Sequence, residues 1–385
     1  MMPRPTLKLS TVLCGMALFA GPALAEDYVI GVTAAQSGWL AAYDQPGYAG
    51  FKFCIDEINA KGGMAGKFKA VIDVRDTRSD TAESVKLAQE FVDKKVNFIV
   101  APSDGDPTMA MGQITSPAGI PTMTFAGTAP VLTSVGEFVF GSYPGDNQQA
   151  AVLGAYAAEL GYKTAWLLKS PDSSYTMKGP EYFGQVFEAK GGKVIGEGSF
   201  TLNQPDFSAI VTTIKALDPQ PDVITTWAWE PDFPAFIKAL RGAGVTTPVM
   251  GADVLDTTTV RGLGDVVNGV VHTSGGYPEP GSKHEDFNNR FKAATGMEAD
   301  TNYVVNGCDI ALMIDAAVTA ADSTDPKAVR DALANLKDSP GIMSNFTFAG
   351  TDRMPIRAVV LAKIENGQKV FVRRDQADPA MIPAP

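Results

Sequence analysis

Short runs of β-branched residues alternate with amphipathic segments along most of this chain. The run 28–32 predicts a buried strand, and 47–60 predicts a helix with Phe51, Ile55 and Ile58 on one face. Further strands are predicted at 69–74, 97–101, 122–125, 164–168, 223–227 and 249–250, and further helices at 81–94, 148–160, 182–190, 208–216 and 233–242. Strands that alternate with helices of this length form βαβ units, so the pattern predicts parallel sheets covered by helices on both faces.

The pattern changes near the end of the chain. Runs 346–348 and 359–364 predict strands, and 370–372 follows Asn366-Gly367, a strong hairpin signal. We therefore expect an antiparallel hairpin added to a parallel sheet. A length of 385 residues suggests two domains. No low-complexity linker separates two halves, which indicates lobes that exchange segments.

The N-terminus has the order of a secretory signal peptide. Arg4 and Lys8 are basic, 11–20 is mostly apolar, and Ala23-Leu24-Ala25 matches the small-x-small cleavage pattern. We expect a signal peptide at 1–25, cleavage after Ala25 and a soluble exported protein. Cys14 raises a lipoprotein alternative, but the residues before it lack the small residue of a lipobox. No other segment has about 20 uninterrupted apolar residues.

Charge and cysteine content narrow the class of protein. The net charge of −11 and the pI near 4.8 argue against nucleic acid or an anionic membrane as a partner. Cys54 and Cys308 allow one disulfide in the exported chain, but both lie in apolar helical patterns, which favours buried free thiols. The cysteines and the two histidines show no zinc-ligand spacing, so we expect no metal site.

Polar and aromatic residues follow several predicted strands. Ligands of open parallel sheets bind at the carboxyl ends of the strands. The residues in these places are 37–43, 103–106, 126–128, 173–175, Trp229 and Asp253. Hydroxyls, aromatic rings and one acid at a common edge suit a small polar molecule with an apolar part.

Several motifs carry a family resemblance over essentially all of the exported chain. They are Ser37-Gly38 followed by Tyr43, Asp-Glu-Ile-Asn-Ala-Lys-Gly-Gly at 56–63, Gly-Thr-Ala-Pro-Val-Leu-Thr at 127–133, Asp-Phe-Ser at 206–208, and Ala-Leu-Arg-Gly-Ala-Gly at 239–244. The chain resembles the branched-chain (Leu/Ile/Val) amino-acid binding proteins, periplasmic substrate-binding components of ABC transporters with the type I periplasmic binding fold.

The resemblance implies two Rossmann-like α/β lobes joined by three hinge crossings. The crossings fall near 141–146, 273–276 and 344–346. The N-terminal lobe is then 26–142 plus 275–344, and the C-terminal lobe is 143–274 plus 345–385. Such lobes close on a ligand by bending at the hinges.

The resemblance also implies site residues. Tyr43 and Tyr303 match aromatic walls of the pocket, and Tyr175 and Trp229 match aromatics that close over the ligand from the second lobe. Asp253 matches an acid that pairs with the ligand ammonium, with Asp256 as its rival. Ala126, Gly127 and Thr128 match a segment that offers a carbonyl to the ammonium, and an amide and a hydroxyl to the ligand carboxylate.

The chain departs from the family in the loop after the third strand. Gly105 stands where the family often has a carboxylate-binding serine, so either Ser103 or the Gly105 amide takes that role. Asp104 replaces the family's cysteine, which removes the family disulfide and favours a cationic ligand.

Ordinary structural roles compete with these site roles. Asp106-Pro107 is typical of a helix start, with Asp106 as N-cap. Thr128 can cap the segment before Pro130, although we favour a binding role. Trp227 and Trp229 point to opposite faces of a strand, so we expect Trp227 in the core. Trp39, Ser173 and Asp232 are expected at the rim of the site.

An enzyme is the main competing class. The chain has no G-x-S-x-G, P-loop, H-E-x-x-H or G-x-G-x-x-G motif. His272 lies at a predicted strand end near a hinge, and His284 lies in a polar, solvated stretch. We therefore expect no catalysis and no cofactor.

The expected function is capture of a small amino acid, or an amino-acid-like carboxylate, for a membrane permease by a monomer. One alternative is the same architecture with a benzoate-type aromatic acid as ligand, and the other is a free-standing ligand sensor. The aromatic acid is an alternative because it could stack on the rings of Tyr43, Phe125, Tyr175, Trp229 and Tyr303.

Overall fold

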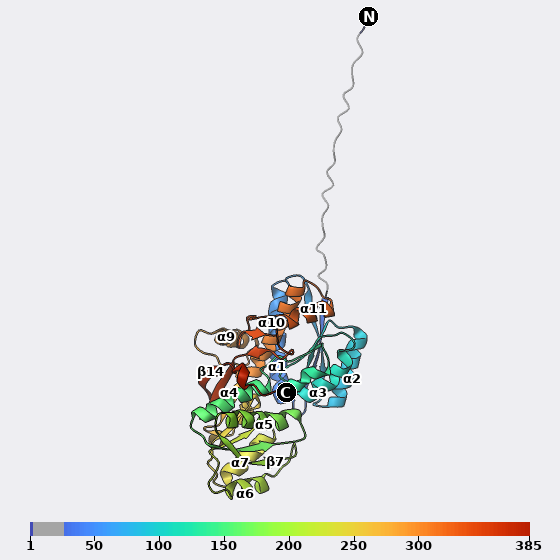
Figure 1. Cartoon of the computed structure of the whole chain (residues 1–385). Coiled ribbons are helices and arrows are strands. Elements are labelled where there is room, and N and C mark those ends of the chain that lie inside the picture. Colours follow the sequence, from blue (N-terminus) through green and yellow to red (C-terminus); the bar gives the residue numbers. More distant parts are fainter. Residues whose placement is uncertain (3–26) are drawn as a thin grey trace.

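The computed structural model of the protein describes residues 1–2 and 27–385. The basic residues, apolar segment and cleavage site of the predicted signal peptide lie outside the described residues. The described chain folds into two α/β lobes, stacked one above the other in Figure 1. Two Rossmann-like lobes with sheets flanked by helices confirm the predicted fold class.

The first lobe contains a five-stranded parallel sheet in the order β2-β1-β3-β4-β5. Its strands are β1 (Asp27–Ala34), β2 (Lys69–Asp76), β3 (Phe98–Ala101), β4 (Thr122–Thr124) and β5 (Val139–Phe140). Its helices are α1 (Ala41–Ala60), α2 (Thr81–Lys94), α3 (Gly105–Thr115), α9 (Lys283–Thr295), α10 (Asn302–Ala321) and α11 (Pro326–Ala334). One core cluster joins the sheet to α1, α9, α10 and α11, and a second joins it to α2 and α3.

The second lobe contains a seven-stranded sheet in the order β14-β13-β10-β9-β8-β6-β7. Its strands are β6 (Thr164–Lys169), β7 (Lys193–Ser199), β8 (Val223–Thr226), β9 (Val249–Gly251), β10 (Val271–Ser274), β13 (Val359–Glu365) and β14 (Gln368–Asp375). Its helices are α4 (Asp146–Glu159), α5 (Ser174–Ala189), α6 (Ser208–Lys215), α7 (Asp232–Gly242) and α8 (Thr258–Arg261). The strands β13 and β14 form the predicted hairpin through Asn366-Gly367, and β13 pairs antiparallel with β10. Both turn residues have positive φ, which an Asn-Gly pair adopts readily.

Three connections join the lobes. They lead from β5 to α4, from β10 to α9, and from the small ribbon β11 (Phe346–Thr347) and β12 (Ile356–Arg357) to β13. Phe346 and Phe348 belong to the core of the first lobe. At the third connection Arg357 is buried and forms an ion pair with buried Asp309 of α10.

Helices α1 and α10 touch backbone to backbone, and this contact explains a wrong prediction about the cysteines. A Cβ added at Gly50 would lie 1.7 Å from the carbonyl oxygen of Val304, and one at Gly307 would lie 1.9 Å from that of Gly47. Because glycines allow this approach, Cys54 and Cys308 have Cα atoms 5.2 Å apart and form a disulfide. The expectation of free thiols, made from each helix alone, is therefore overturned.

Several element boundaries also differ from the prediction. Helix α1 begins at Ala41 and α5 at Ser174, earlier than predicted, because each continues through an interior proline, Pro46 and Pro180. In α5 the carbonyl of Thr176, which Pro180 cannot pair with, accepts a hydrogen bond from the Ser170 amide at 3.2 Å. The strand β7 was not predicted.

Two residue assignments need correction. The N-cap of α3 is Asp104 and not Asp106, because the Asp104 carboxylate accepts a hydrogen bond from the Asp106 amide at 3.2 Å. His284 is buried, not solvated, because it shares the packed face of α9 with Phe287 and Phe291. Burial lowers the pKa of His284 to about 3.

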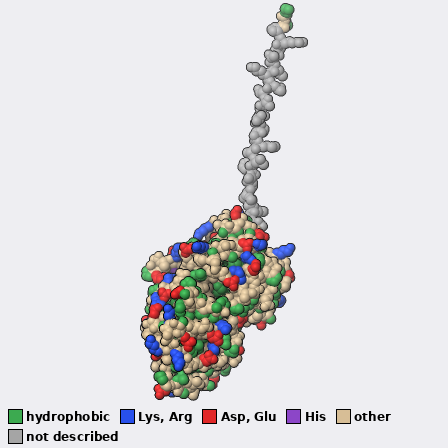
Figure 2. Space-filling view, viewed as in Figure 1, with side chains coloured by type: hydrophobic (Ala, Val, Ile, Leu, Met, Phe, Trp, Pro, Cys, Tyr) green, Lys and Arg blue, Asp and Glu red, His purple; other side chains and the backbone are tan. Residues whose placement is uncertain are grey.

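In the described part of the chain, α10 alone is long and apolar enough to cross a membrane. Most of its side chains are buried in the first lobe, so it reads as a core helix. Acidic and basic side chains are interspersed over the face of the molecule drawn in Figure 2, without a concentrated basic patch.

Candidate ligand-binding site

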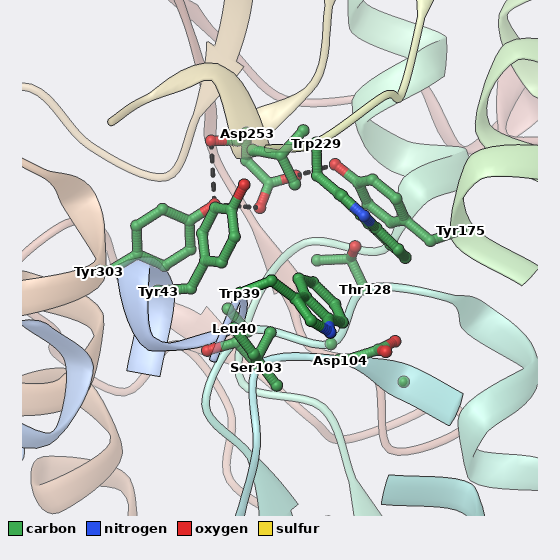
Figure 3. A pocket seen from close by; sticks show the side chains of 14 residues that line it. Trp39, Leu40, Tyr43, Ser103, Asp104, Thr128, Tyr175, Trp229, Asp253 and Tyr303 are labelled. Carbon is green, nitrogen blue, oxygen red and sulfur yellow. Dashed lines mark hydrogen bonds between the residues drawn. The ribbon is translucent and has the colours of Figure 1, made fainter. Parts of the chain in front are cut away.

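A small cavity lies between the lobes, with a volume of about 30 Å³ in which the centre of a water-sized molecule fits. It sits where the carboxyl ends of β1, β3 and β4 face those of β8 and β9 (Figure 3). All ten predicted site residues line it: Tyr43, Ser103, Gly105, Ala126, Gly127, Thr128, Tyr175, Trp229, Asp253 and Tyr303. Trp39, Leu40, Asp104 and Val254 complete the lining. Their contact with a ligand remains a prediction.

Aromatic rings form most of the cavity wall. Trp39 stacks on Trp229 with ring centroids 4.9 Å apart and planes 18° apart, and Tyr175 stacks on Trp229 at 5.8 Å. On the other side Tyr43 meets Tyr303 edge-on at 5.3 Å. Trp39 thus belongs to the wall and not only to the rim. The stack joins the lobes, because Trp39 follows β1 and Trp229 follows β8.

Asp253 is buried at the end of β9, with tyrosines on two sides. The Tyr175 hydroxyl donates to its Oδ1 at 3.1 Å, and the Tyr303 hydroxyl donates to its backbone carbonyl at 3.0 Å. Figure 3 shows both contacts. Burial raises the pKa of Asp253 to about 6, although hydrogen bonds to its carboxylate from Gln149, Tyr175 and Tyr303 lower it. Asp253 has no basic partner among the described residues, so a cation in the cavity would stabilise its charged form.

Asp256, the rival acid, has a structural role. Its carboxylate pairs with Lys369 at 2.8 Å and Arg261 at 3.0 Å, and it accepts a hydrogen bond from Asn302 at 2.6 Å. Burial favours the neutral form of Asp256, but the charge of Lys369 and its other neighbours outweighs burial and holds the pKa below its ordinary value. Because the oxygens of Asp256 are already paired, Asp253 stays the predicted ligand residue.

The loop after β4 is held by hydrogen bonds within the protein. The Gly127 amide donates to Thr124 Oγ1 at 2.8 Å. The Thr128 hydroxyl donates to Asp146 Oδ1 at 2.7 Å, and the Asp146 amide donates to the Thr128 carbonyl at 2.9 Å. Burial and the charge of Asp253 raise the pKa of Asp146 well above its usual range. These contacts connect Thr128 to the first turn of α4 in the second lobe.

The loop after β3 carries a second acid beside the cavity. Asp104 caps α3, and burial and the charge of Asp106 raise its pKa to about 7. Beneath the loop, buried Asp44 accepts from the amides of Ala35 at 2.7 Å and Ser103 at 2.8 Å. Asp44 therefore ties the ends of β1 and β3 together, which positions Ser103 at the cavity.

Hydrogen bonds cross the gap between the lobes outside the cavity. Ser174 at the start of α5 donates to Asp106 of α3 at 2.7 Å, and the Glu230 amide donates to the Tyr43 hydroxyl at 3.1 Å. The lobes are therefore in a closed arrangement. Asp106 thus has an interlobe contact in place of its predicted N-cap role.

Other candidate residues lie away from the cavity. Trp227 is fully buried in the core of the second lobe, as expected, and Phe125 lies in the core of the first. Ser173 is the N-cap of α5, and buried Asp232 accepts from the Asn203 amide at 3.1 Å. Leu40 lies within the predicted site loop 37–43, whereas Val254 was missed, because a single apolar residue in a loop carries no signal that distinguishes a cavity wall from the core.

Comparisons with known proteins agree with this architecture. A family model described as "Periplasmic binding protein" matches residues 27–369. The chain is 26% identical over 373 residues to the "Leu/Ile/Val-binding protein BraC3" of Rhizobium johnstonii, with 95% of this chain and 99% of that protein covered.

Two solved structures share the fold. One is the branched-chain amino acid transporter substrate binding protein LivJ from Streptococcus pneumoniae in complex with isoleucine, with a TM-score of 0.82, 23% identity, and 91% of this chain and 100% of that chain covered. The other is a solute binding protein of an R. palustris ABC transporter in complex with 4-hydroxybenzoate, with a TM-score of 0.82, 21% identity, and 92% and 98% covered.

Proposed function

The chain belongs to the periplasmic binding protein family, and on that premise we propose that it captures a small amino-acid-type solute between its lobes and delivers it to the permease of an ABC transporter. The observation that carries the proposal is Asp253, a buried acid without a basic partner among the described residues, in a cavity walled by aromatic rings. An ammonium group satisfies such an acid, and the rings can enclose an apolar side chain.

The relatives support the transport role. The matched R. johnstonii protein is named for binding leucine, isoleucine and valine, and the S. pneumoniae structure holds isoleucine. The family works in the periplasm, which agrees with the predicted signal peptide and cleavage after Ala25. Members of this family bind substrates for transport, which supports a non-catalytic role. We propose that the protein acts as a monomer. Uptake measurements distinguish this transport role from that of a free-standing ligand sensor.

The lobes are proposed to follow the predicted division, 26–142 plus 275–344 and 143–274 plus 345–385, with one refinement. Phe346 and Phe348 pack in the core of the first lobe, so we propose that the last boundary lies after the ribbon β11–β12. The three connections are then the hinges.

A second candidate function is capture of a benzoate-type acid. The aromatic wall and the R. palustris structure with 4-hydroxybenzoate favour it. The two acids in the lining oppose it, because an aromatic carboxylate would face Asp104 or Asp253 in a poorly solvated site. Amino-acid-type solutes therefore remain the first proposal.

A thermal-shift screen tests the proposal. Purified protein without its residues 1–25 is mixed with amino acids, small amines and aromatic acids. Ligand at 100 times its Kd stabilises the folded state by about 2.7 kcal/mol, which gives a clear rise in Tm. We expect the rise with ammonium-bearing compounds. A rise with benzoates alone would select the second candidate, and uptake of the identified ligand that is unchanged in a strain lacking the protein would favour a sensor.

A further inference from the structure

The charged groups of the cavity all have one sign. Asp104 and Asp253 line it from opposite lobes, and no lysine, arginine or histidine is among its lining residues. Asp44 and Asp106 lie close behind Asp104, and their charges contribute to its raised pKa. A ligand carboxylate would therefore enter a poorly solvated space that already holds acids, where like charges repel strongly.

Several of the groups expected to receive a ligand carboxylate already have partners within the protein. The Gly127 amide donates to Thr124 at 2.8 Å, and the Thr128 hydroxyl donates to Asp146 at 2.7 Å. At the N-terminus of α3 the Asp106 amide donates to the Asp104 carboxylate at 3.2 Å. A helix N-terminus attracts anions, but here a side chain of the protein occupies that position.

Ser103 is a further expected donor. By distance and angle its buried Oγ has no hydrogen-bond partner among the described residues, although the hydroxyl lies near the Asp44 carboxylate and helps to lower the pKa of Asp44. A hydroxyl accepts from N–H as readily as it donates to an oxygen, so Ser103 suits an ammonium or amide group as well as a carboxylate. It is not enough by itself to compensate for two neighbouring acids.

The aromatic wall suits a cation. Trp39, Trp229 and Tyr175 form a stack on one side of the cavity, and the ring pair of Tyr43 and Tyr303 stands on the other (Figure 3). Trp39 and Trp229 come from different lobes, so a ligand that enters between the lobes separates these two rings and meets their faces. The negative face of an aromatic ring attracts ammonium groups, most strongly where water is excluded. Rings and carboxylates together make a receptor for positive charge.

We propose that the cavity recognises its ligand as a cation and does not require a ligand carboxylate. The preferred class is then small amines and amino-acid amides or esters with an apolar side chain, rather than free zwitterionic amino acids. The inference rests on the proposed binding function and narrows its substrate class. Asp253 holds the ammonium, and Asp104 disfavours the carboxylate of a free amino acid.

Two matched ligand sets test the inference by titration calorimetry at pH 7. One set is leucine, leucinamide, 3-methylbutylamine and 4-methylpentanoate. The other is phenylalanine, phenylalaninamide, phenethylamine and 3-phenylpropanoate. Within each set the apolar group is the same and the charged groups change. We expect the amide and the amine to bind at least about tenfold more tightly than the free amino acid, and the anion not to bind.

Asp104→Asn separates charge from shape in this loop. It removes the negative charge while keeping an oxygen that can cap α3. Because Asp104 has a pKa of about 7 and is half ionised at pH 7, the preference for the amide over the free amino acid should fall by about twofold at pH 7 and by roughly tenfold at pH 8. Asp106→Asn is the matched control. Asp106 does not line the cavity, but its charge helps to keep Asp104 protonated, so this change should weaken all ligands through its contact with Ser174 and keep or increase the preference for the amide, opposite to Asp104→Asn.

The outcomes separate the inference from the proposed function. Free amino acids that bind more than tenfold more tightly than their amides, with a ratio that Asp104→Asn leaves unchanged, would overturn the inference and leave the binding function intact. Failure of all eight compounds to bind would count against amino-acid-type binding itself, and the inference would fall with it.

Discussion

Asp253 and Asp256 lie three residues apart and have opposite surroundings. The Asp253 carboxylate has neutral partners, the side chain of Gln149 and the hydroxyls of Tyr175 and Tyr303, whereas Asp256 is paired with Lys369 and Arg261. Truncating one partner of a buried charge pair costs about 2–5 kcal/mol or more. The same substitution at the two positions should therefore have different effects, on ligand binding at one and on folding at the other.

We predict that Asp253→Asn weakens binding of an ammonium ligand by roughly 30-fold or more, with little change in Tm. Asp256→Asn should instead lower Tm, because it leaves Lys369 and Arg261 without their partner. Calorimetric titration and thermal unfolding of both variants provide the measurements. Unchanged affinity in Asp253→Asn, together with a large loss in Asp256→Asn, would identify Asp256 as the ligand residue.

The same variant has a pH signature. The pKa of Asp253 is raised to about 6, so the acid is mostly protonated below that pH and ionised above it. The ammonium binds the ionised form, so affinity should be full near pH 8 and about tenfold weaker near pH 5. The titratable groups facing Asp253 are Tyr43, Tyr143, Asp146, Tyr175 and Tyr303, and burial raises the pKa of each. In Asp253→Asn the ligand affinity should depend much less on pH, and the dependence that remains should come from ionisation of Asp104.

The sequence places the site residues well because the carboxyl ends of parallel strands meet at one edge. Tyr43, Thr128 and Asp253 are far apart in the chain, yet each follows a strand and reaches the same cavity. Hydrogen-bond partners are harder to predict. The sequence alone does not indicate that Thr128 donates to Asp146, because the two residues come from different lobes.

At the scale of elements, the contact between α1 and α10 determines the state of the cysteines. The disulfide Cys54–Cys308 closes a sequence separation of 254 residues, and it connects the helix after β1 to the helix that carries Tyr303. A disulfide stabilises mainly by restricting the unfolded chain, typically by 2–4 kcal/mol. The sequence of each helix is apolar around its cysteine, which favours a buried free thiol. The disulfide therefore becomes evident only when the two helices are seen packed together.

We predict that Cys54→Ser combined with Cys308→Ser lowers the free energy of unfolding by about 2–4 kcal/mol. Urea unfolding of the double variant and of the wild type, with and without a reducing agent, provides the measurement. The reduced wild type should match the variant closely. Equal urea midpoints for the oxidised wild type, the reduced wild type and the variant would contradict a stabilising role for the bond.

At the scale of the whole molecule, the alternation of strands and helices predicted parallel sheets flanked by helices, and the length together with the family resemblance predicted two lobes. The Asn366-Gly367 pair predicted the terminal hairpin. Helix beginnings were less predictable, because Pro46 and Pro180 look like boundaries although α1 and α5 continue through them. How the lobes meet depends on pairs such as Trp39 with Trp229, which no local pattern contains.

The closed arrangement is held outside the cavity by individual hydrogen bonds and ion pairs, such as those from Asn302 to Asp256 and from Arg261 to Asp300, and each of them can break when the lobes separate. Ser174 donates to Asp106 at 2.7 Å and the Glu230 amide donates to Tyr43 at 3.1 Å, while three short connections join the lobes. Contacts of this size contribute about 0.5–1.5 kcal/mol each, so a ligand that binds both lobes can shift the equilibrium between open and closed forms.

Small-angle scattering should show a smaller radius of gyration with saturating ligand than without it. Ser174→Ala removes one contact without changing the cavity wall, so it should weaken binding roughly 2- to 10-fold and leave the ligand-saturated scattering curve unchanged. Identical curves with and without a tightly bound ligand would show that the lobes do not move, and the interlobe hydrogen bonds would then be permanent parts of the fold.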